Sequence, residues 1–264
     1  MATIWTLITV SYNSVDALRQ FWTERPPESV EWLVVDNASS DESVTVAESL
    51  GARVIRNERN LGFGAANNVA FREARGRYVG FVNPDVKVHY GDLDVARRVL
   101  EENPSAVIAP QLVGTEGDLQ QNGRGEPYIL DKILHRLAPQ KVEGRYTLYA
   151  EAGIRKTVPW LTGAVLLADR STFESLGPWD ERFFLYYEDT DLCLRARRQG
   201  CRVMLVGDMN WTHGWARSSA NLNPRAIGHE LASMSKFYMR YPGYILRPGL
   251  SMSSRSSNAA GASG

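Results

Sequence analysis

Short apolar runs that stop abruptly at polar residues constrain the fold of this chain most. The clearest is Tyr78–Val82, an aromatic and β-branched run typical of a buried strand, which ends at Asn83-Pro84-Asp85. In an open α/β sheet the ligand crevice lies outside the carboxyl ends of the strands, so we expect Asp85 to point into that crevice. Asn, Pro and Asp are also ordinary turn residues, and a plain turn is the alternative interpretation.

Runs of the same kind recur, separated by segments with helical patterns. Strands are expected at Ile4–Val10, Trp32–Asp36, Arg53–Arg56, Tyr78–Val82 and Ala106–Gln111. Helices are expected from a cap at Ser14 to Phe21, up to about Leu50 where Gly51 ends the helix, and over Phe63–Arg75 and Asp92–Glu102. This alternation predicts an α/β fold with a mostly parallel, Rossmann-like nucleotide-binding sheet flanked by helices.

The pattern changes after Gln111. Residues 114–157 are irregular and are expected to cover the crevice. A long strand is then expected over Val158–Ala168, interrupted at Gly163, where a bulge or a close backbone approach is the usual cause. Further expected elements are an aromatic lead at Phe183–Tyr187, a helix ending at Gly200, a strand pair at Cys201–Val206 and Met209–His213, and a helix over Arg225–Arg240 with Ile227, Leu231, Met234 and Tyr238 on its apolar face.

Composition excludes several classes of protein. The 30 basic residues balance the 30 acidic ones, so bulk charge gives no reason to expect nucleic-acid binding. No apolar run approaches the roughly 20 residues that a membrane helix needs. The two cysteines, Cys193 and Cys201, are too few for a disulfide framework and fit a cytoplasmic protein. Residues 248–264 are rich in Ser, Ala and Gly and are expected to form a disordered tail.

Several motifs in this order resemble family 2 of the inverting glycosyltransferases, which have the GT-A fold, and in particular the bacterial rhamnosyltransferase-like members. They are Val10-Ser-Tyr-Asn13, residues 34–41, residues 57–67, residues 81–85, Trp160-Leu-Thr-Gly-Ala164 and residues 184–195. The resemblance implies one GT-A domain with a nucleotide-sugar-binding half at 1–111 and an acceptor-binding and catalytic half at 112–247. It also implies a saccharide or lipid-linked acceptor in the synthesis of a bacterial cell-surface polysaccharide or glycoconjugate.

The resemblance assigns roles residue by residue. It places a catalytic base in the pair Glu188 and Asp189, with Asp189 preferred and Asp191 as a structural cap or ion-pair partner. It places Mg²⁺ or Mn²⁺ at Asp85, with His213 completing the metal shell. The residues implied to bind the nucleotide sugar are Ser11, Tyr12, Asn13, Asp36, Asn37, Asn60, Gly62, Phe63, Asn67, Asn83, Asp85, Thr162 and Gly163.

One departure from the family pattern concerns the metal. The usual motif is Asp-x-Asp, but its first carboxylate is Asn83 here. Mg²⁺ often needs only one or two carboxylates plus substrate phosphates, so Asp85 can suffice, and Mn²⁺ also accepts a histidine nitrogen. Without a metal, Arg124 or Arg217 would neutralise the diphosphate. Asn83 keeps open the alternative of a catalytically inactive, nucleotide-sugar-binding relative with a scaffolding role.

The donor and the cellular setting are expected only in outline. dTDP-rhamnose is the first candidate donor by resemblance, followed by UDP-sugars. Residues 192–250 contain nine basic residues and only two acidic ones. This excess of positive charge leaves open peripheral contact with the inner face of the membrane. A homo-oligomer is also left open.

Overall fold

The computed structural model describes residues 3–177, 179–214 and 224–246, with the side chains of 224–226 left aside. It contains the expected α/β sheet, with strands in the order β3-β2-β1-β4-β11-β6-β12-β5 and β9 paired to β12. The strands are β1 (Trp5–Ser11), β2 (Val30–Asp36), β3 (Arg53–Arg56), β4 (Tyr78–Val82), β5 (Val86–Lys87), β6 (Val107–Val113), β9 (Arg155–Thr157), β11 (Val165–Asp169) and β12 (Val203–His213).

The sheet is mixed rather than uniformly parallel. Strands β3, β2, β1 and β4 run parallel, as do β6 and β12. Strand β11 lies between these two groups and runs antiparallel to both β4 and β6. Because β11 enters the sheet where β4 ends, Val165 pairs with Val82 and the chain before β11 reaches the carboxyl edge of the sheet.

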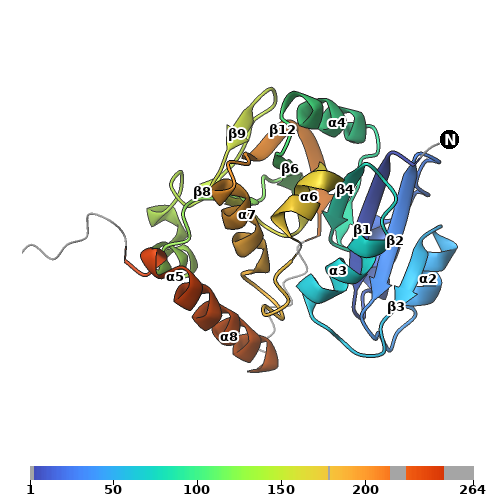
Figure 1. Cartoon of the computed structure of the whole chain (residues 1–264), viewed down its shortest axis with the longest axis horizontal. Helices are drawn as coiled ribbons and strands as arrows, with labels where there is room; N and C mark the ends of the chain where they lie inside the picture. The colour runs from blue at the N-terminus through green and yellow to red at the C-terminus, as the bar shows by residue number, and fades with distance from the viewer. Residues whose placement is uncertain (1–2, 178, 215–223, 247–264) are drawn as a thin grey trace, which may run out of the picture.

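Helices cover both faces of the sheet, which gives three layers (Figure 1). One apolar core lies under α3 (Phe63–Glu73), α6 (Arg170–Leu176) and α7 (Glu188–Arg198). The other lies under α1 (Val15–Phe21), α2 (Ser43–Ser49) and α4 (Asp92–Glu102). Sheet residues alternate between the two cores, as Leu7 and Ile8 do, because successive side chains of a strand point to opposite faces.

The acceptor-side extension forms a smaller structure at one end of the molecule. A three-stranded sheet is built from β7 (Gly123–Arg124), β8 (Thr147–Leu148) and β10 (Trp160–Leu161), in the order β10-β7-β8. Beside it lie α5 (Ile129–Leu137), the short helix η1 (Pro139–Lys141), α8 (Pro224–Arg240) and the short helix η2 (Pro242–Tyr244). Helices α5 and α8 lie at the end opposite β3 and α2 (Figure 1).

Three expected elements differ from the structure. The strand expected over Val158–Ala168 is two strands, β10 and β11, which belong to different sheets and are separated at Gly163. The strand pair expected before His213 is one strand, β12, whose pairing with β6 shifts between Val206 and Asn210. A β-bulge of this kind bends a strand without ending it, so the residues at the bulge imitate a turn in the sequence.

Helix α8 buries only part of the expected face: Tyr238 is buried and Met234 packs beside it, but Ile227 and Leu231 do not take part. Phe237, Tyr238 and Tyr241 are buried in a cluster with Phe183 and Tyr187, while Ile227 and Leu231 are 43% and 55% exposed. Within the described residues no helix is long and apolar enough to cross a membrane. The tail expected at residues 248–264 lies outside the described residues.

Candidate active site

The carboxyl ends of β1 and β2 are joined by hydrogen bonds between polar loops. Asn13, at φ 50°, accepts at Oδ1 from the Ser40 backbone N–H (2.8 Å), and its own N–H donates to Ser39 Oγ (2.9 Å). Ser14 is the N-cap residue of α1, as expected, but its side chain makes no capping bond, and Asp41 Oδ2 instead accepts from the Val15 N–H (3.1 Å). Asn13 and Tyr12 therefore stand on a rigid support and line a pocket at this edge.

Asn37 organises the loop of residues 57–62. Its Oδ1 accepts from the Leu61 N–H (2.9 Å) and its Nδ2 donates to Asn60 Oδ1 (2.8 Å). The loop then turns into α3 at Gly62, where φ is 88° and an added Cβ would lie 2.5 Å from the Phe184 carbonyl oxygen. Glycine is needed there both for its positive φ and for this close approach. The loop thus brings Phe63 and the segment 183–187 together across the site.

Three of the expected donor ligands lie below the surface of the site. Ser11, Asp36 and Asn67 are at most 5% exposed and line none of the three pockets described below. Asn67 Nδ2 donates to the Phe63 carbonyl, and Asp36 Oδ2 accepts from the Ser39 N–H. Ser11 Oγ and Asp36 Oδ1 are buried and have no hydrogen-bond partner among the described residues. Unsatisfied buried polar atoms are uncommon, and a ligand that reaches them is one explanation.

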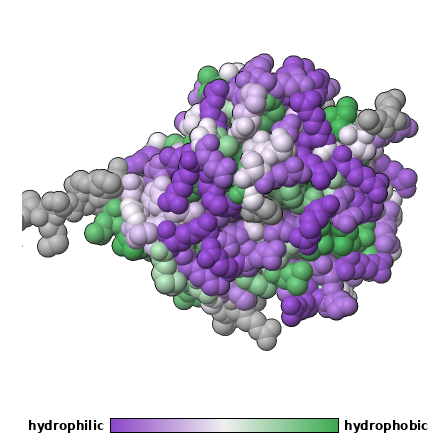
Figure 2. Space-filling view, viewed as in Figure 1, coloured by the Kyte–Doolittle hydropathy of each residue, from purple (hydrophilic) through white to green (hydrophobic). Residues whose placement is uncertain are grey.

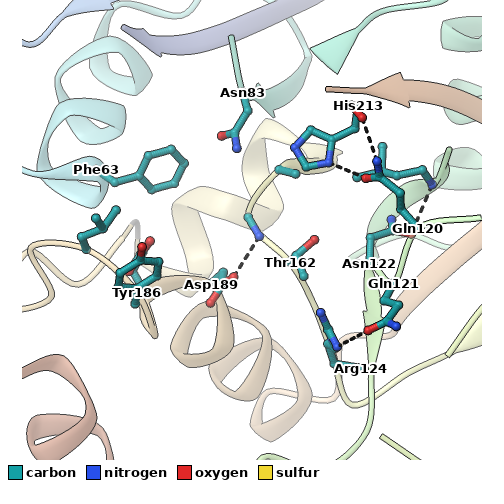
Figure 3. Close-up of a pocket in the computed structure, with 15 residues that line it drawn as sticks. Phe63, Asn83, Gln120, Gln121, Asn122, Arg124, Thr162, Tyr186, Asp189 and His213 are labelled. Carbon is teal, nitrogen blue, oxygen red and sulfur yellow. Dashed lines mark hydrogen bonds between the residues drawn. The ribbon is translucent and has the colours of Figure 1, made fainter. Parts of the chain in front are cut away.

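Asp85 and His213, the two expected metal ligands, meet at the same edge. Asp85 Oδ1 lies 3.5 Å from His213 Nε2, and both side chains are 13% exposed. Trp22 Nε1 donates to the Pro84 carbonyl, which holds the turn before Asp85. Gln120 fixes the imidazole, because its Nε2 donates to the His213 carbonyl (2.8 Å) and its Oε1 lies 2.7 Å from Nδ1 (Figure 3).

This geometry fits a divalent cation bound between the two side chains. Since Gln120 Oε1 is an acceptor, His213 Nδ1 carries a proton and, in the neutral ring, Nε2 presents a lone pair toward the Asp85 carboxylate. A carboxylate oxygen and a histidine lone pair that face each other are both stabilised by a cation between them. Metal-binding histidines are usually oriented by a second group at the other ring nitrogen, as Gln120 orients His213 here. Among the described residues no group of three or more His, Cys, Asp or Glu side chains could hold a metal, so donor phosphates would supply the remaining ligands.

Three neighbouring pockets, each of which shares lining residues with the next, run across the site. The first, about 540 Å³, is lined by Tyr12, Asn13, Asn37, Asn60, Gly62 and Asp85, among others. The central one, about 280 Å³, shares Phe63 and Asn83 with the first and adds Thr162, Gly163 and His213. The third, about 580 Å³, lies between α5, α7 and α8 and shares Glu188 and Asp189 with the central pocket.

Asp189 stands at the junction of the central and third pockets. Its Oδ2 accepts from the Gly163 N–H (2.9 Å; Figure 3). Its Oδ1 accepts from the Thr190 N–H (2.6 Å), and the two bonds fix its orientation. An added Cβ at Gly163 would lie 3.3 Å from Asp189 Cβ, so the break expected at this glycine is a close backbone approach. The Asp189 side chain therefore borders both the central and the third pocket.

Glu188 differs from Asp189 although the two are adjacent. It is 5% exposed, and its Oε2 has no hydrogen-bond partner among the described residues. Burial raises the pKa of this carboxyl well above its ordinary value, and the neighbouring Asp189 charge raises it further. Asp191 is structural, as expected: it accepts from Arg195 Nε (2.8 Å) and from Tyr241 Oη (2.7 Å).

Several polar residues that line these pockets could not be assigned a role from the sequence. Gln120, Gln121 and Asn122 form a run of amides in which Asn122 donates to the Pro110 carbonyl of β6 and Gln120 to the His213 carbonyl of the neighbouring strand β12. Lys132 on α5 was also missed. A polar run in an irregular segment and a lysine in a short helix carry no distinctive pattern. Arg217, which with Arg124 was expected to neutralise the diphosphate in the absence of a metal, lies outside the described residues.

The sequence and the structure are similar to those of known glycosyltransferases. The family model "Glycosyl transferase family 2" matches residues 6–162. An N-acetylglucosaminyl-diphospho-decaprenol L-rhamnosyltransferase from Mycobacterium tuberculosis is 27% identical over 245 residues, which covers 83% of this chain and 78% of the relative. The low-salt glycan biosynthesis hexosyltransferase Agl10 of Haloferax volcanii is 26% identical over 202 residues, and covers 75% of this chain. This chain spans 62% of that relative.

A solved structure shares the fold. The mannosyltransferase PcManGT from Pyrobaculum calidifontis, in complex with GDP-Man and Mn²⁺, superposes with a TM-score of 0.60 at 17% identity. The match covers 90% of this chain and 65% of that one. The family model matches more than half of this chain. The chain therefore belongs to glycosyl transferase family 2, with a GT-A fold and a rhamnosyltransferase-like sequence.

Proposed function

We propose that this protein is an inverting glycosyltransferase. It moves a sugar from a nucleoside-diphosphate sugar to a hydroxyl of a saccharide or lipid-linked acceptor, in the synthesis of a bacterial cell-surface polysaccharide or glycoconjugate. Family membership and the two relatives named as transferases support this proposal. dTDP-rhamnose is the first donor to test because one relative is named an L-rhamnosyltransferase.

The donor would occupy the first and central pockets. The nucleoside would lie against Tyr12, Asn13, Asn37 and Asn60, which line the first pocket. Its polar groups would also reach the buried side chains of Asp36 and Ser11 beneath that pocket. The diphosphate and sugar would lie against Asn83, Thr162 and Gly163. Residues 1–111 would form the nucleotide-sugar-binding half and residues 112–247 the acceptor-binding and catalytic half of one domain, with Thr162 and Gly163 of the second half also reaching the donor.

Asp85 and His213 would hold Mg²⁺ or Mn²⁺ on the donor diphosphate. Bound there, the ion would neutralise the charge that develops on the departing nucleoside diphosphate. The geometry of these two residues supports the assignment, and the Mn²⁺ complex of the structural neighbour is consistent with it.

Asp189 would take the proton from the acceptor hydroxyl. In a single displacement, the acceptor attacks the anomeric carbon from the face opposite the leaving group, so the base and the metal must flank the sugar. The observation that carries the proposal is the position of Asp189: it borders the central pocket, which His213 also lines, and the separate pocket beyond it. Glu188 is the less suitable base because its burial favours the protonated form.

A donor panel tests the function. Thermal unfolding with Mn²⁺ and dTDP-rhamnose, UDP-sugars or GDP-sugars should reveal one stabilising donor, since a ligand at 100 times its dissociation constant adds about 2.7 kcal/mol. Slow hydrolysis of that donor, with the opposite anomeric configuration in the first-formed sugar, would support inverting transfer. If no donor stabilises the protein, the proposal fails.

Binding without any turnover would instead support the inactive, scaffolding relative. Asn83 favours this second candidate because it removes one carboxylate from the expected metal motif. The proposed cellular position is cytoplasmic, with peripheral membrane contact and oligomerisation as separate questions for the purified protein.

A further inference from the structure

The third pocket contains two cations that the proposed chemistry does not use. It lies between α5, the start of α7 and α8, and measures about 580 Å³. Lys132 reaches it from α5 and Arg124 from β7. Arg124 also lines the central pocket, whereas Lys132 lines the third pocket alone.

Lys132 has no polar partner within the described part of the chain. Its Nζ lies 3.6 Å from the ring centroid of Tyr187 and 5.1 Å from that of Trp160. Burial lowers its pKa to about 7, an effect that Asp189 partly offsets and Arg124 reinforces. Aromatic faces attract a cation, but they replace only part of the water that the ammonium has lost.

Arg124 is similarly short of counter-charge. It is 7% exposed, and its Nη1 bonds Gln121 Oε1 (3.1 Å) and lies 3.0 Å from His135 Nε2. Burial and Arg124 itself lower the pKa of His135 to about 4, so this imidazole is neutral and accepts the bond. Arg124 Nε is buried without a partner, and no described carboxylate forms an ion pair with the guanidinium.

The charges around the pocket leave it positive. The groups facing Lys132 are Asp189, Glu188, Glu230, Arg124 and Arg136. Arg136 and Glu230 pair with each other, and Glu188 is held toward its protonated form. Two cations then face one unpaired carboxylate, Asp189. Buried cations without counter-charge reduce stability, and a site that keeps them is suited to an anionic ligand.

We propose that the third pocket binds a phosphate group carried by the acceptor, with Lys132 and Arg124 as its cationic ligands. This inference rests on the proposed function, because it takes Asp189 as the base that faces the acceptor hydroxyl. The phosphate would anchor the acceptor beside that base, and it is distinct from the donor diphosphate, which lies toward Asp85.

The mouth of the pocket is apolar. Ile133 and Leu231 line it and are 47% and 55% exposed. Leu130 and Leu137 continue the same face of α5, at 42% and 79% exposure. Hydrophobic side chains are visible among hydrophilic ones at this end of the molecule (Figure 2). A phosphate ester bound by Lys132 would therefore place its substituent either along this apolar rim, if it is lipid-borne, or in solvent, if it is a soluble sugar phosphate.

Sulfate is the first probe, since it remains a dianion from pH 5 to 9. Its dissociation constant would be measured by calorimetry with the donor pocket saturated by the best nucleoside diphosphate of the panel. We expect Lys132→Met to weaken sulfate binding about tenfold or more, because a charge-assisted hydrogen bond is lost. Wild-type protein should bind sulfate more tightly at pH 6 than at pH 8.5, and the variant should show a smaller difference, since only the ionisation of Glu188 then remains.

Matched variants separate the site from general effects. Lys141→Met removes an exposed lysine of η1 and should leave sulfate affinity unchanged. Lys132→Met should itself raise the melting temperature at pH 6 more than at pH 9, which shows that lost binding does not reflect unfolding. Arg124→Gln is the second variant. Equal sulfate affinity in wild type and in both pocket variants would overturn the proposal.

Two further probes identify the source of the phosphate. If it is lipid-borne, farnesyl diphosphate should bind more tightly than inorganic pyrophosphate, and Leu231→Ser should weaken only the former. Equal affinities would assign a soluble phosphate ester, and binding of neither probe would reject the site. Donor hydrolysis without any anion binding defeats this inference alone, whereas anion binding at Lys132 without donor binding defeats the proposed function alone.

Discussion

Asp85 Oδ1 and His213 Nε2 lie 3.5 Å apart because the ends of β4 and β12 meet through the short strand β5. His213 pairs with Val86 in this ladder, and the Gly214 N–H donates to the Asp85 carbonyl (2.8 Å). Backbone bonds on both sides therefore set the distance between the two side chains. A pair held in this way would need no backbone rearrangement to hold the proposed cation.

The first prediction concerns that cation. Gln120→Leu should weaken Mn²⁺ affinity about 10- to 100-fold, because the His213 ring loses the partner that orients it. Mn²⁺ titration in the presence of the nucleoside diphosphate, followed by thermal unfolding, measures this effect. His89→Gln, an exposed histidine, is the control. Full transfer activity after thorough chelation would show that the metal role is wrong and would make Arg124 the candidate for charge neutralisation.

The second prediction compares the two adjacent carboxylates. Asp189→Asn should lower turnover by about 10²- to 10⁴-fold, the usual cost of losing a general base, with little change in donor affinity. Glu188→Gln should have the smaller effect because burial already favours the neutral form of Glu188. Turnover and donor binding are measured in the same preparations. A dead Glu188→Gln with an active Asp189→Asn would reverse the assignment, and two active variants would remove the pair from the chemistry.

The third prediction concerns Asp36. Its Oδ1 is buried without a partner among the described residues, and we expect the nucleotide to reach it. Asp36→Ala should weaken nucleotide binding about tenfold or more, the loss expected for a hydrogen bond to a charged group. Calorimetry with Glu58→Ala, an exposed carboxylate of the neighbouring loop, provides the comparison. Unchanged affinity in a variant that still unfolds cooperatively would exclude Asp36 from the site.

The fourth prediction is a pH dependence of stability. The pKa of Glu188 is higher in the folded chain than its ordinary value of 4.5, so the folded state holds a proton that the unfolded state releases. Its contribution to the free energy of unfolding is fully present below pH 4.5 and is lost as the pH rises through the folded-state pKa. Relative to Glu188→Gln, wild-type stability should fall as the pH is raised from 4.5. Parallel stability curves over that range would contradict the burial argument.

Much of the fold could be predicted because β1 to β4 and their helices are local repeats of one pattern. Tyr78–Val82 and Asp92–Glu102 match the structure residue for residue. The second half was harder, because β10 and β11 are adjacent in sequence but belong to different sheets. Only long-range pairing separates them, and periodicity within a run does not report it.

Site residues divide along the same line. Asp85 follows the end of strand β4, and Asp189 lies in the first turn of helix α7. Both follow apolar runs, and a polar residue directly after such a run is recognisable in the sequence. Lys132 and Gln120 are not recognisable in this way, since one is a lysine in the short helix α5 and the other a polar residue in an irregular segment, and the position of both depends on the tertiary fold. Likewise Ile227 and Leu231 have helical spacing but remain exposed, because spacing identifies an apolar face and not its partner.

The antiparallel strand β11 has a consequence for substrate choice. The Asn83 N–H donates to the Ala164 carbonyl (2.9 Å), one residue from Gly163, whose N–H holds Asp189. This backbone bond, one residue beyond the last pair of the β4–β11 ladder, connects the proposed metal side of the site to the proposed base side, so the edge of the sheet holds the gap between them. In the proposed site, room for a bulkier donor sugar would therefore have to come from the residues at the ends of the loops 57–62 and 183–187 that line the pockets, because a change there leaves the backbone bond at the sheet edge intact.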